Sequence, residues 1–187
     1  WTGPYGFQCG YLSYAEEIPL CLKSIPIQLS FMTILYAITE LHEGGAENAL
    51  WEVARRAADE GHLVRVVCLY GGDGAVAARM RQEDINVVGL GRSPLSGFLR
   101  LLRLRSEVLK VKPDIVHSWL FHANFACRLV LPRSIPLLCS LRVCEPRKTH
   151  VYLDRWTRNR VAMYIANSRD VAEFAKKEVK APNRKCC

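Results

Sequence analysis

Six short apolar runs, each followed by a segment with helical periodicity, constrain the fold of this chain more than any other feature. The first run, TILYAI, precedes AENALWEVARRAADE, whose apolar residues recur at helical spacing. We expect strands at 33–38, 63–70, 85–90, 114–119, 136–143 and 164–168, each followed by a helix. Almost wholly apolar strands that alternate with helices are typical of a parallel sheet covered on both faces. The pattern therefore predicts an α/β fold with a doubly wound (Rossmann-like), mostly parallel sheet.

The length of the chain suits one such domain. It has 187 residues, of which 50% are hydrophobic and 24% charged. This suffices for one core and leaves little room for a second. The first 31 residues lack the basic start and cleavage site of a signal peptide, and two prolines and a lysine interrupt any membrane span. We expect an irregular leader at 1–31, the folded domain at 32–180 and a tail at 181–187.

Charge and cysteine content narrow the class of protein. The net charge is +8, and the excess of Lys and Arg is concentrated in residues 142–187. A basic surface attracts phosphates, whether nucleotides, nucleic acid or anionic lipids carry them. The eight cysteines form neither a C-x-x-C pair nor a zinc-like cluster with histidine. Cys68 and Cys139 lie in apolar runs, so we expect a reduced, cytoplasmic protein rather than one held by disulfides.

Gly44 and Gly45 occupy the loop between the first expected strand and its helix. Ligands of open parallel sheets bind beyond the carboxyl ends of the strands. Glycine tolerates positive φ and lets a ligand approach the backbone, and a helix start offers unpaired N–H groups. These properties favour a bound diphosphate or sugar phosphate. A tight turn, with Glu47 complementing the helix dipole, explains the pair equally well.

A second group of polar residues follows the expected fourth strand, in DIVHSWLFHAN. His117 ends that strand, and His122 and Asn124 open the next helix. Histidine there can hydrogen-bond a hydroxyl or act as a base near neutral pH, and asparagine suits a sugar hydroxyl. Alternatively, His117 is a core histidine with a satisfied hydrogen bond, and Asn124 caps the helix. The histidines lie five residues apart with no third ligand in view, so we expect no metal site.

Two other classes of protein remain open from the residues alone. A dinucleotide-dependent or epimerase-like enzyme predicts a G-x-G-x-x-G motif and an acidic residue after the second strand, whereas the motif is missing and Tyr70 ends that strand. P-loop enzymes are disfavoured because G-x-x-x-x-G-K-[ST] is missing too. A nucleic-acid-binding module would interleave exposed aromatics with basic residues, a pattern that only Trp156 approaches. We expect no cofactor and no nucleic-acid partner.

The segment RSPLSGFLRLLRLRSEVLKVK, residues 92–112, predicts a basic amphipathic helix. Helical spacing places Phe98, Leu101, Leu102, Val108 and Leu109 on one face, and Arg100, Arg103 and Lys110 on the other. Arg105 falls near the apolar side. The apolar face either packs on the sheet, leaving a solvated basic face, or docks on an anionic membrane, where each basic residue contributes about 1 kcal/mol.

The order of these motifs resembles a known family. A strand followed by LHEGGAENAL, then GH, KPDIVHSWLFHAN and YIANSRDVAEF, is similar to the amino-terminal domain of glycosyltransferase family 4 enzymes of the GT-B type. The resemblance runs from about Met32 to Val179. It implies a two-domain enzyme whose amino-terminal domain binds the acceptor and whose other domain holds most of the nucleotide sugar. Such enzymes transfer the sugar from a nucleotide diphosphate to a hydroxyl of a polysaccharide or lipid-linked acceptor, with retention of configuration and usually without a metal.

The resemblance also implies roles for residues of this sequence. It places Gly44 and Gly45 beside the donor diphosphate and transferred sugar, and His117 at the reacting centre as a catalytic residue. The acceptor side receives His122, Asn124 and Ser168.

The sequence departs from the family at two places. Trp119 stands where many relatives have another histidine, which changes one acceptor contact. After its last helix the family continues into a second, donor-binding domain, whereas this chain ends with KKEVKAPNRKCC. The resemblance thus implies that the donor-binding domain is missing. We expect negligible sugar transfer by this chain alone, because that domain stabilises the departing diphosphate.

Overall fold

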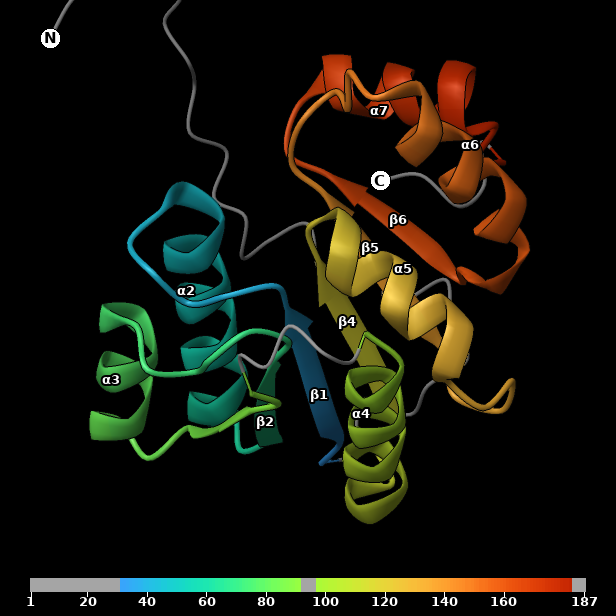
Figure 1. Cartoon of the computed structure of the whole chain (residues 1–187). Coiled ribbons are helices and arrows are strands. Elements are labelled where there is room, and N and C mark those ends of the chain that lie inside the picture. The colour runs from blue at the N-terminus through green and yellow to red at the C-terminus, as the bar shows by residue number, and fades with distance from the viewer. Residues whose placement is uncertain (1–30, 92–96, 183–187) are drawn as a thin grey trace, which may run out of the picture.

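The computed structural model of the chain describes residues 31–91 and 97–182, which form a parallel six-stranded sheet with helices on both faces (Figure 1). The strands are β1 (Thr33–Ile38), β2 (Leu63–Cys68), β3 (Asn86–Gly89), β4 (Ile115–Trp119), β5 (Leu137–Leu141) and β6 (Met163–Ala166). The helices are α2 (Gly45–Asp59), α3 (Ala75–Gln82), α4 (Gly97–Val111), α5 (Phe121–Val130), α6 (Lys148–Thr157) and α7 (Arg169–Phe174). A 3-10 turn, η1 (Arg158–Arg160), follows α6, and a π-helical turn, η2 (Ala175–Val179), follows α7.

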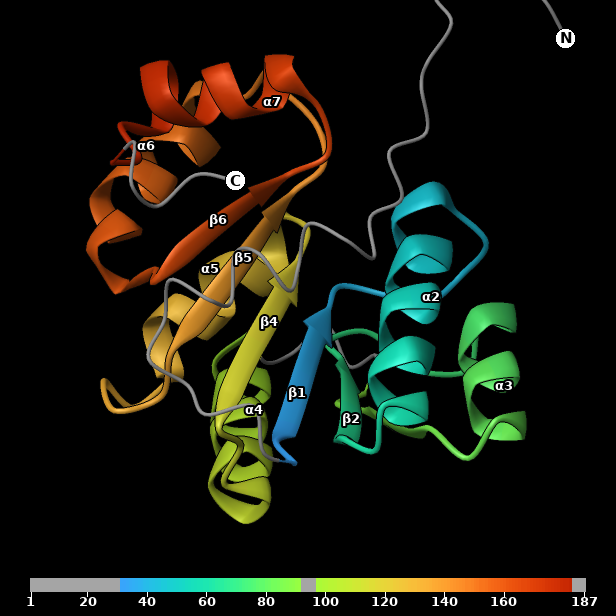
Figure 2. The same ribbon diagram turned by 180° about the vertical axis from the view of Figure 1, so that it is seen from behind.

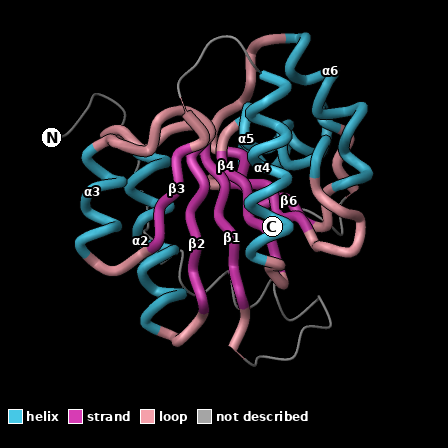
Figure 3. The backbone as a smooth tube through the Cα atoms, turned by 60° about the horizontal axis from the view of Figure 1, so that its bottom comes forward, coloured by secondary structure: helices cyan, strands magenta, loops and turns pink. Residues whose placement is uncertain are grey.

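The strand order is β3-β2-β1-β4-β5-β6. The order reverses between β1 and β4, where Ile34 to Ile38 pair in parallel with Ile115 to Trp119. Figure 3 shows the strands side by side between two groups of helices. The expected doubly wound α/β fold is confirmed. The expected leader, except Phe31, and most of the expected tail lie outside the described residues.

Each face of the sheet has its own apolar core. Leu50, Trp51 and Met80 of α2 and α3 pack on one face, mainly against β1, β2 and β3. Leu104 and Val108 of α4 pack on the other face, together with α5, α7 and η2. Figure 2, seen from behind, shows α2 and α3 in front of the sheet and α4 behind it. The carboxyl ends of the strands form one edge of the sheet, and the helices begin at this edge.

Helix α4 is rotated relative to the expectation from its sequence. Leu104 and Val108 are fully buried, whereas Phe98, Leu102 and Leu109 are 71%, 46% and 50% exposed. The prediction that these last three residues face the sheet with Val108 is therefore wrong. Apolar residues surround most of this helix, so its pattern alone permits several rotations.

An ion pair explains the rotation that α4 adopts. Arg65 Nη2 on β2 donates to Glu107 Oε2 at 2.7 Å, and Lys110 Nζ donates to Glu107 Oε1 at 2.9 Å. Glu107 is buried on the inner side of α4. Leu104, one turn before Glu107, and Val108, the next residue, are thereby turned onto the sheet.

Glycines close the part of the edge that follows β2 and β3. Gly72 has a positive φ of 113°, and a Cβ atom there would lie 2.9 Å from the Cα of Gly89. A Cβ atom at Gly89 would overlap the carbonyl of Gly71, and one at Gly74 would overlap the carbonyl of Leu41. These loops pack backbone against backbone, which only residues without side chains allow.

A buried ion pair joins α5 to α6. Arg128 is fully buried, and its Nη1 donates to Asp154 Oδ1 and, at 3.3 Å, to Thr157 Oγ1. The guanidinium also lies 5.7 Å from the ring centroid of Tyr164 on β6. The ion pair therefore anchors α6, which carries part of the candidate site, to the body of the domain.

Candidate functional site

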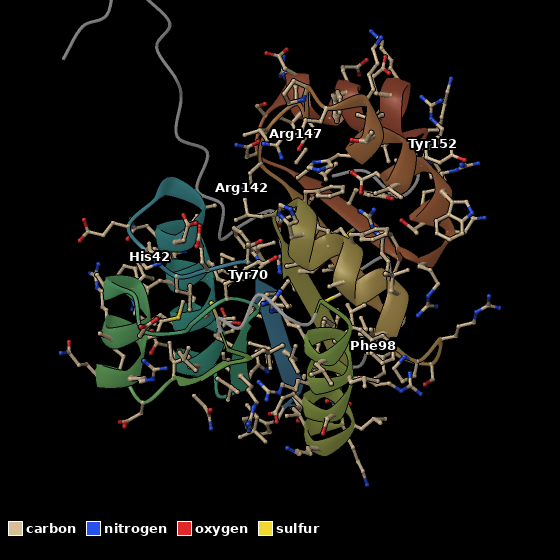
Figure 4. The ribbon with its side chains drawn as sticks, viewed as in Figure 1. His42, Tyr70, Phe98, Arg142, Arg147 and Tyr152 are labelled. Atoms are coloured by element: carbon tan, nitrogen blue, oxygen red, sulfur yellow. The ribbon has the colours of Figure 1, made fainter. Side chains whose placement is uncertain are left out.

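The candidate site lies at the carboxyl ends of β1, β4 and β5. The loops that leave these strands lead to the starts of α2, α5 and α6. In Figure 4, His42 and Arg142 mark the parts of this edge that follow β1 and β5. The edge includes the point where the strand order reverses, which is the usual ligand position in this type of sheet.

Gly44 and Gly45 form the start of α2. Gly44 has an extended backbone, with φ −170° and ψ 166°, and Gly45 is the first helical residue. Neither adopts a positive φ, so the pair is not required by a left-handed turn. No side chain caps this helix, and a Cβ atom at Gly45 would meet nothing within 4 Å. The carboxylate of Glu47, however, lies against Gly44, where an added Cβ atom would overlap its Oε2. This carboxylate must move aside before a phosphate can reach the first-turn N–H groups, and diphosphate binding stays a prediction.

His117 lies inside the sheet. Its side chain is buried, and its Nε2 is 2.8 Å from Ser140 Oγ on β5. The ring packs between those of Tyr36 and Trp119, at centroid distances of 5.6 and 5.0 Å. Burial, assisted by the charge of Arg142, lowers the pKa of His117 to about 3. The imidazole is thus neutral and engaged between strands, and its catalytic role, which stays a prediction, requires this packing to open.

Asn124 is also turned into the protein. It is 1% exposed, and its Oδ1 accepts a hydrogen bond from Ser118 Oγ at 2.7 Å. Its Nδ2 donates to the carbonyl of Ser140 at 3.0 Å. The amide therefore ties the first turn of α5 to both β4 and β5. Acceptor binding by Asn124 stays a prediction, and in this conformation the side chain serves the fold.

His122 belongs to a cluster whose other members the sequence analysis missed. His150 Nδ1 lies 3.0 Å from Glu145 Oε2, and the ring of His150 stacks on that of Phe121 at 3.7 Å and 4°. The ring of His122 meets that of His150 edge-on at 5.7 Å. We call Phe121, His122, Glu145 and His150 the rim cluster. It joins the segments that follow β4 and β5.

The rim cluster has an uneven distribution of charge. Burial, followed by the charges of His150 and Arg147, lowers the pKa of His122. Burial tends to raise the pKa of Glu145, but its contacts with His150 and with the backbone N–H of Arg147 hold that pKa below its ordinary value. At neutral pH the cluster therefore combines a neutral imidazole with a carboxylate. Such a pair can accept and orient the hydrogen bond of a hydroxyl group.

The start of α6 explains why the rim cluster was missed. The sequence predicts this helix from 152, whereas α6 begins at Lys148. Glu145 Oε1 accepts a hydrogen bond from the N–H of Arg147 at 3.1 Å, which supports the earlier start. His150 then lies in the first turn and reaches back to Phe121. The one available signal was the position of Glu145 just after a strand.

Ser168 caps α7 at the same edge of the sheet. Its Oγ accepts a hydrogen bond from the N–H of Val171 at 3.3 Å. The neighbouring Asn167 donates from Nδ2 to the carbonyl of Arg142 at 3.0 Å, which joins the ends of β5 and β6. The Arg142 guanidinium lies 4.9 Å from the ring centroid of Trp119. Ser168 is exposed at the edge, and its contact with an acceptor stays a prediction.

Leu120 connects β4 to α5 through a strained backbone. Its φ is 70° and its ψ is 155°, a backbone conformation that residues other than glycine rarely adopt. The carbonyl of Leu120 accepts the N–H of Asn124 at 2.9 Å, which begins α5. The sharp turn brings Phe121 and His122 to the rim directly after the buried Trp119. Strain of this kind is characteristic of functional sites.

Two general features of the described residues complete the site. Within ranges 31–91 and 97–182, no three His, Cys, Asp or Glu side chains converge as a metal site would require. None of the helices in these ranges has the length and apolar character needed to cross a bilayer.

The strand order, with a helix start and a polar rim at the switch point, defines a Rossmann-like domain. Solved structures share this fold. HepE of Anabaena in complex with UDP is 20% identical, with a TM-score of 0.69 over 83% of this chain and 43% of that protein. A glycosyltransferase from Rickettsia africae is 14% identical, with a TM-score of 0.62 over 83% and 42%. UDP-N-acetylglucosamine 2-epimerase from Rickettsia bellii is 13% identical, with a TM-score of 0.55 over 83% and 44%.

The family follows from the sequence rather than from these structures. The chain matches the model of Glycosyltransferase Family 4 over residues 43–187, and it belongs to that family. A search of curated proteins finds no significant match. At 20% identity or less, the solved structures establish the fold alone, and the chain spans less than half the length of each. The resemblance inferred from the motifs is confirmed.

Proposed function

We propose that this domain is the acceptor-binding part of a retaining glycosyltransferase. The enzyme would transfer a sugar from a nucleotide-diphosphate sugar to a hydroxyl group of a polysaccharide or lipid-linked glycan. The family match over residues 43–187 carries the proposal. The fold shared with HepE, which was solved with UDP, supports a nucleotide-diphosphate donor. An epimerase also shares the fold, but the family match favours transfer.

The start of α2 is the proposed contact for the donor diphosphate. Gly45 adds no side chain that would keep a phosphate away, and no side chain caps the first-turn N–H groups. The Glu47 carboxylate, which lies against Gly44, has to turn away when the diphosphate binds. Negative charge near a helix N-terminus is stabilised by these groups and by the helix dipole. During transfer, charge develops on the leaving diphosphate, so the same contact lowers the energy of the transition state.

The rim cluster is the proposed contact for the acceptor hydroxyl. His122 is neutral because burial lowers its pKa, so a ring nitrogen can accept the hydroxyl proton in a hydrogen bond. Glu145 and Phe121 fix the orientation of His150, the first by its contact with Nδ1 at 3.0 Å and the second by stacking. Ser168 lies on the same edge. His117 and Asn124 enter the proposal as residues that reach the acceptor only after the packing between β4 and β5 opens.

The cytoplasm is the proposed compartment. Cys68, Cys127 and Cys139 are buried and free in the structure. Burial raises the pKa of the Cys68 thiol to about 11 and also raises those of Cys127 and Cys139. The thiols therefore stay protonated and serve as small apolar groups, as is usual in a reducing environment.

Titration of the amide NMR spectrum with UDP tests the donor contact. We expect the amide signals of residues 44–48 to shift most. The variant Gly45→Glu, which places a carboxylate at the helix start, should weaken UDP binding by up to about fivefold, because such a charge contributes up to about 1 kcal/mol there. Gly97→Glu is the matched control, since Gly97 also begins a helix and a Cβ atom there also meets nothing within 4 Å. Equal weakening by both variants would contradict the proposal.

The 187-residue chain on its own is expected to transfer no sugar. The proposed α2 contact forms one wall of the donor site, and the family places the diphosphate clamp in a second domain. The measurement is release of nucleotide from UDP-sugars and GDP-sugars, with His117→Ala as the background. Turnover above this background would refute the expectation without affecting the UDP titration.

A further inference from the structure

The outer face of α4 carries an apolar strip that the core does not use. Phe98, Leu99, Leu102 and Leu109 form this strip, which we call the α4 strip. They are 71%, 52%, 46% and 50% exposed. Leu104 and Val108, on the inner side, already provide the packing of α4 on the sheet. The stick view shows Phe98 at the end of α4 that lies toward the candidate site (Figure 4).

Basic side chains flank the α4 strip on both sides. Helical spacing places Arg105 on one side, and Arg103 and Lys110 on the other. Arg103 Nη1 donates to the carbonyl of Leu90 at 2.8 Å, and Arg105 Nη1 donates to the carbonyl of Val130 at 2.8 Å. These contacts hold the guanidinium groups beside the strip and leave their charge unneutralised, because a carbonyl is uncharged.

Acidic side chains are confined to the inner side of α4. Within α4, which the structure describes from Gly97 to Val111, the one acid is Glu107. It is buried, and it contacts Arg65 and Lys110. Its carboxylate therefore does not face the surroundings of the α4 strip. Lys110 shares its charge with this carboxylate, so Arg103 and Arg105 supply the unneutralised positive charge beside the exposed apolar side chains.

We propose that the outer face of α4 is a docking surface for an anionic membrane. Phe98, Leu99, Leu102 and Leu109 enter the boundary between headgroups and acyl chains, and the flanking basic groups bind lipid phosphates. A helix that lies in the interface requires this combination of an apolar stripe and cationic flanks. The positive flanks select an anionic lipid surface over a neutral one, with about a fivefold change in binding for each basic residue. This docking does not depend on the proposed transfer activity.

Vesicle co-sedimentation of the full chain tests the docking surface. The probes are vesicles of phosphatidylcholine alone and of phosphatidylcholine with phosphatidylglycerol. We expect binding to the anionic vesicles only, with a decrease at high salt because counterions screen the basic groups. The double variant Phe98→Ser, Leu102→Ser should lower this binding about tenfold or more. Arg103→Gln with Arg105→Gln should lower it while removing the preference for anionic lipid.

Tyr152→Ser with Trp156→Ser is the matched control. Both side chains are 67% exposed on α6, so the pair removes a comparable apolar area from another face. This control should bind vesicles like the parent chain. Equal loss in the α4 and α6 variants would overturn the proposal, as would equal binding to neutral and anionic vesicles. Loss of self-association in the α4 variant, with vesicle binding unchanged, would show that a protein partner occupies the strip and would also overturn it.

Discussion

The two halves of the sheet are held together by different means. Around β1, β2 and β3, apolar side chains of α2 and α3 fill the core, and glycine loops pack backbone on backbone. Around β4, β5 and β6, buried polar side chains make the connections: His117 to Ser140, Asn124 to Ser118 and Ser140, and Arg128 to Asp154. In the second half, a polar residue near the site can therefore belong to the fold. In this half, the polar groups that reach the surface at the site include His122 and Ser168.

Asp154→Ala should lower the free energy of unfolding most, because it removes a buried ion pair from the half of the sheet that polar contacts hold together. Arg128 would remain buried and charged without its partner, which typically costs about 3–5 kcal/mol. Urea unfolding followed by circular dichroism measures the change. Glu173→Ala is the control, since its ion pairs with Lys176 and Lys177 are exposed and worth about 1 kcal/mol or less. A similar small loss for both variants would show that the buried pair does not support the second half.

Gly89→Ala should have the next largest effect, in the half that packs backbone on backbone. The new methyl group would overlap the carbonyl of Gly71, and neither chain can move away without displacing β3 or the loop after β2. Overpacking of this kind costs about 1–3 kcal/mol. Gly45→Ala adds the same methyl group where nothing lies within 4 Å, so it should be close to neutral in the same unfolding experiment. Comparable losses from both substitutions would argue against tight packing of these loops.

The effect that is smallest for each step of the experiment is a pH dependence that distinguishes the halves. His117 has a pKa of about 3 in the folded chain and 6.5 ordinarily, so between these values the unfolded chain binds a proton that the folded chain does not. Stability contributed by the neutral imidazole is complete above pH 6.5 and falls by about 1.4 kcal/mol per pH unit below it.

The free energy of unfolding measured from pH 7 to pH 4 tests this dependence. His117→Gln should flatten the slope, whereas the exposed His42→Gln serves as the control for removing an imidazole. An unchanged slope in His117→Gln would show that the ring is accessible to protons in the folded chain. That result would also favour a direct role of His117 at the reacting centre.

The helices and strands were predictable where the local sequence pattern alone determines the secondary structure. β1 coincides with the expected range 33–38, because an apolar run needs no distant partner to form a strand. The rotation of α4 was not predictable, because it depends on an ion pair between Arg65 and Glu107, which lie 42 residues apart. A local pattern contains no information about such a contact.

The candidate site shows the same division. The position of Gly44 and Gly45 at a helix start follows from their neighbours in sequence, and the structure has them there. The rim cluster depends on stacking between Phe121 of α5 and His150 of α6. That contact needs the sheet order and the earlier start of α6 together. The burial of His117 likewise depends on Tyr36 and Ser140 from neighbouring strands.

The amide of Asn124 has a consequence for how this domain can diverge among relatives. Its two ends satisfy the hydroxyl of Ser118 and the carbonyl of Ser140 at once. A change at position 124 removes the donor of the buried Ser140 carbonyl whatever residue stands at position 118, whereas the Ser118 hydroxyl can still donate to the carbonyl of Leu138. In an alignment of homologues, position 124 should therefore vary less than position 118. His122, two residues away at the surface, is free to change singly, so new acceptor preferences can arise there without rebuilding the interior.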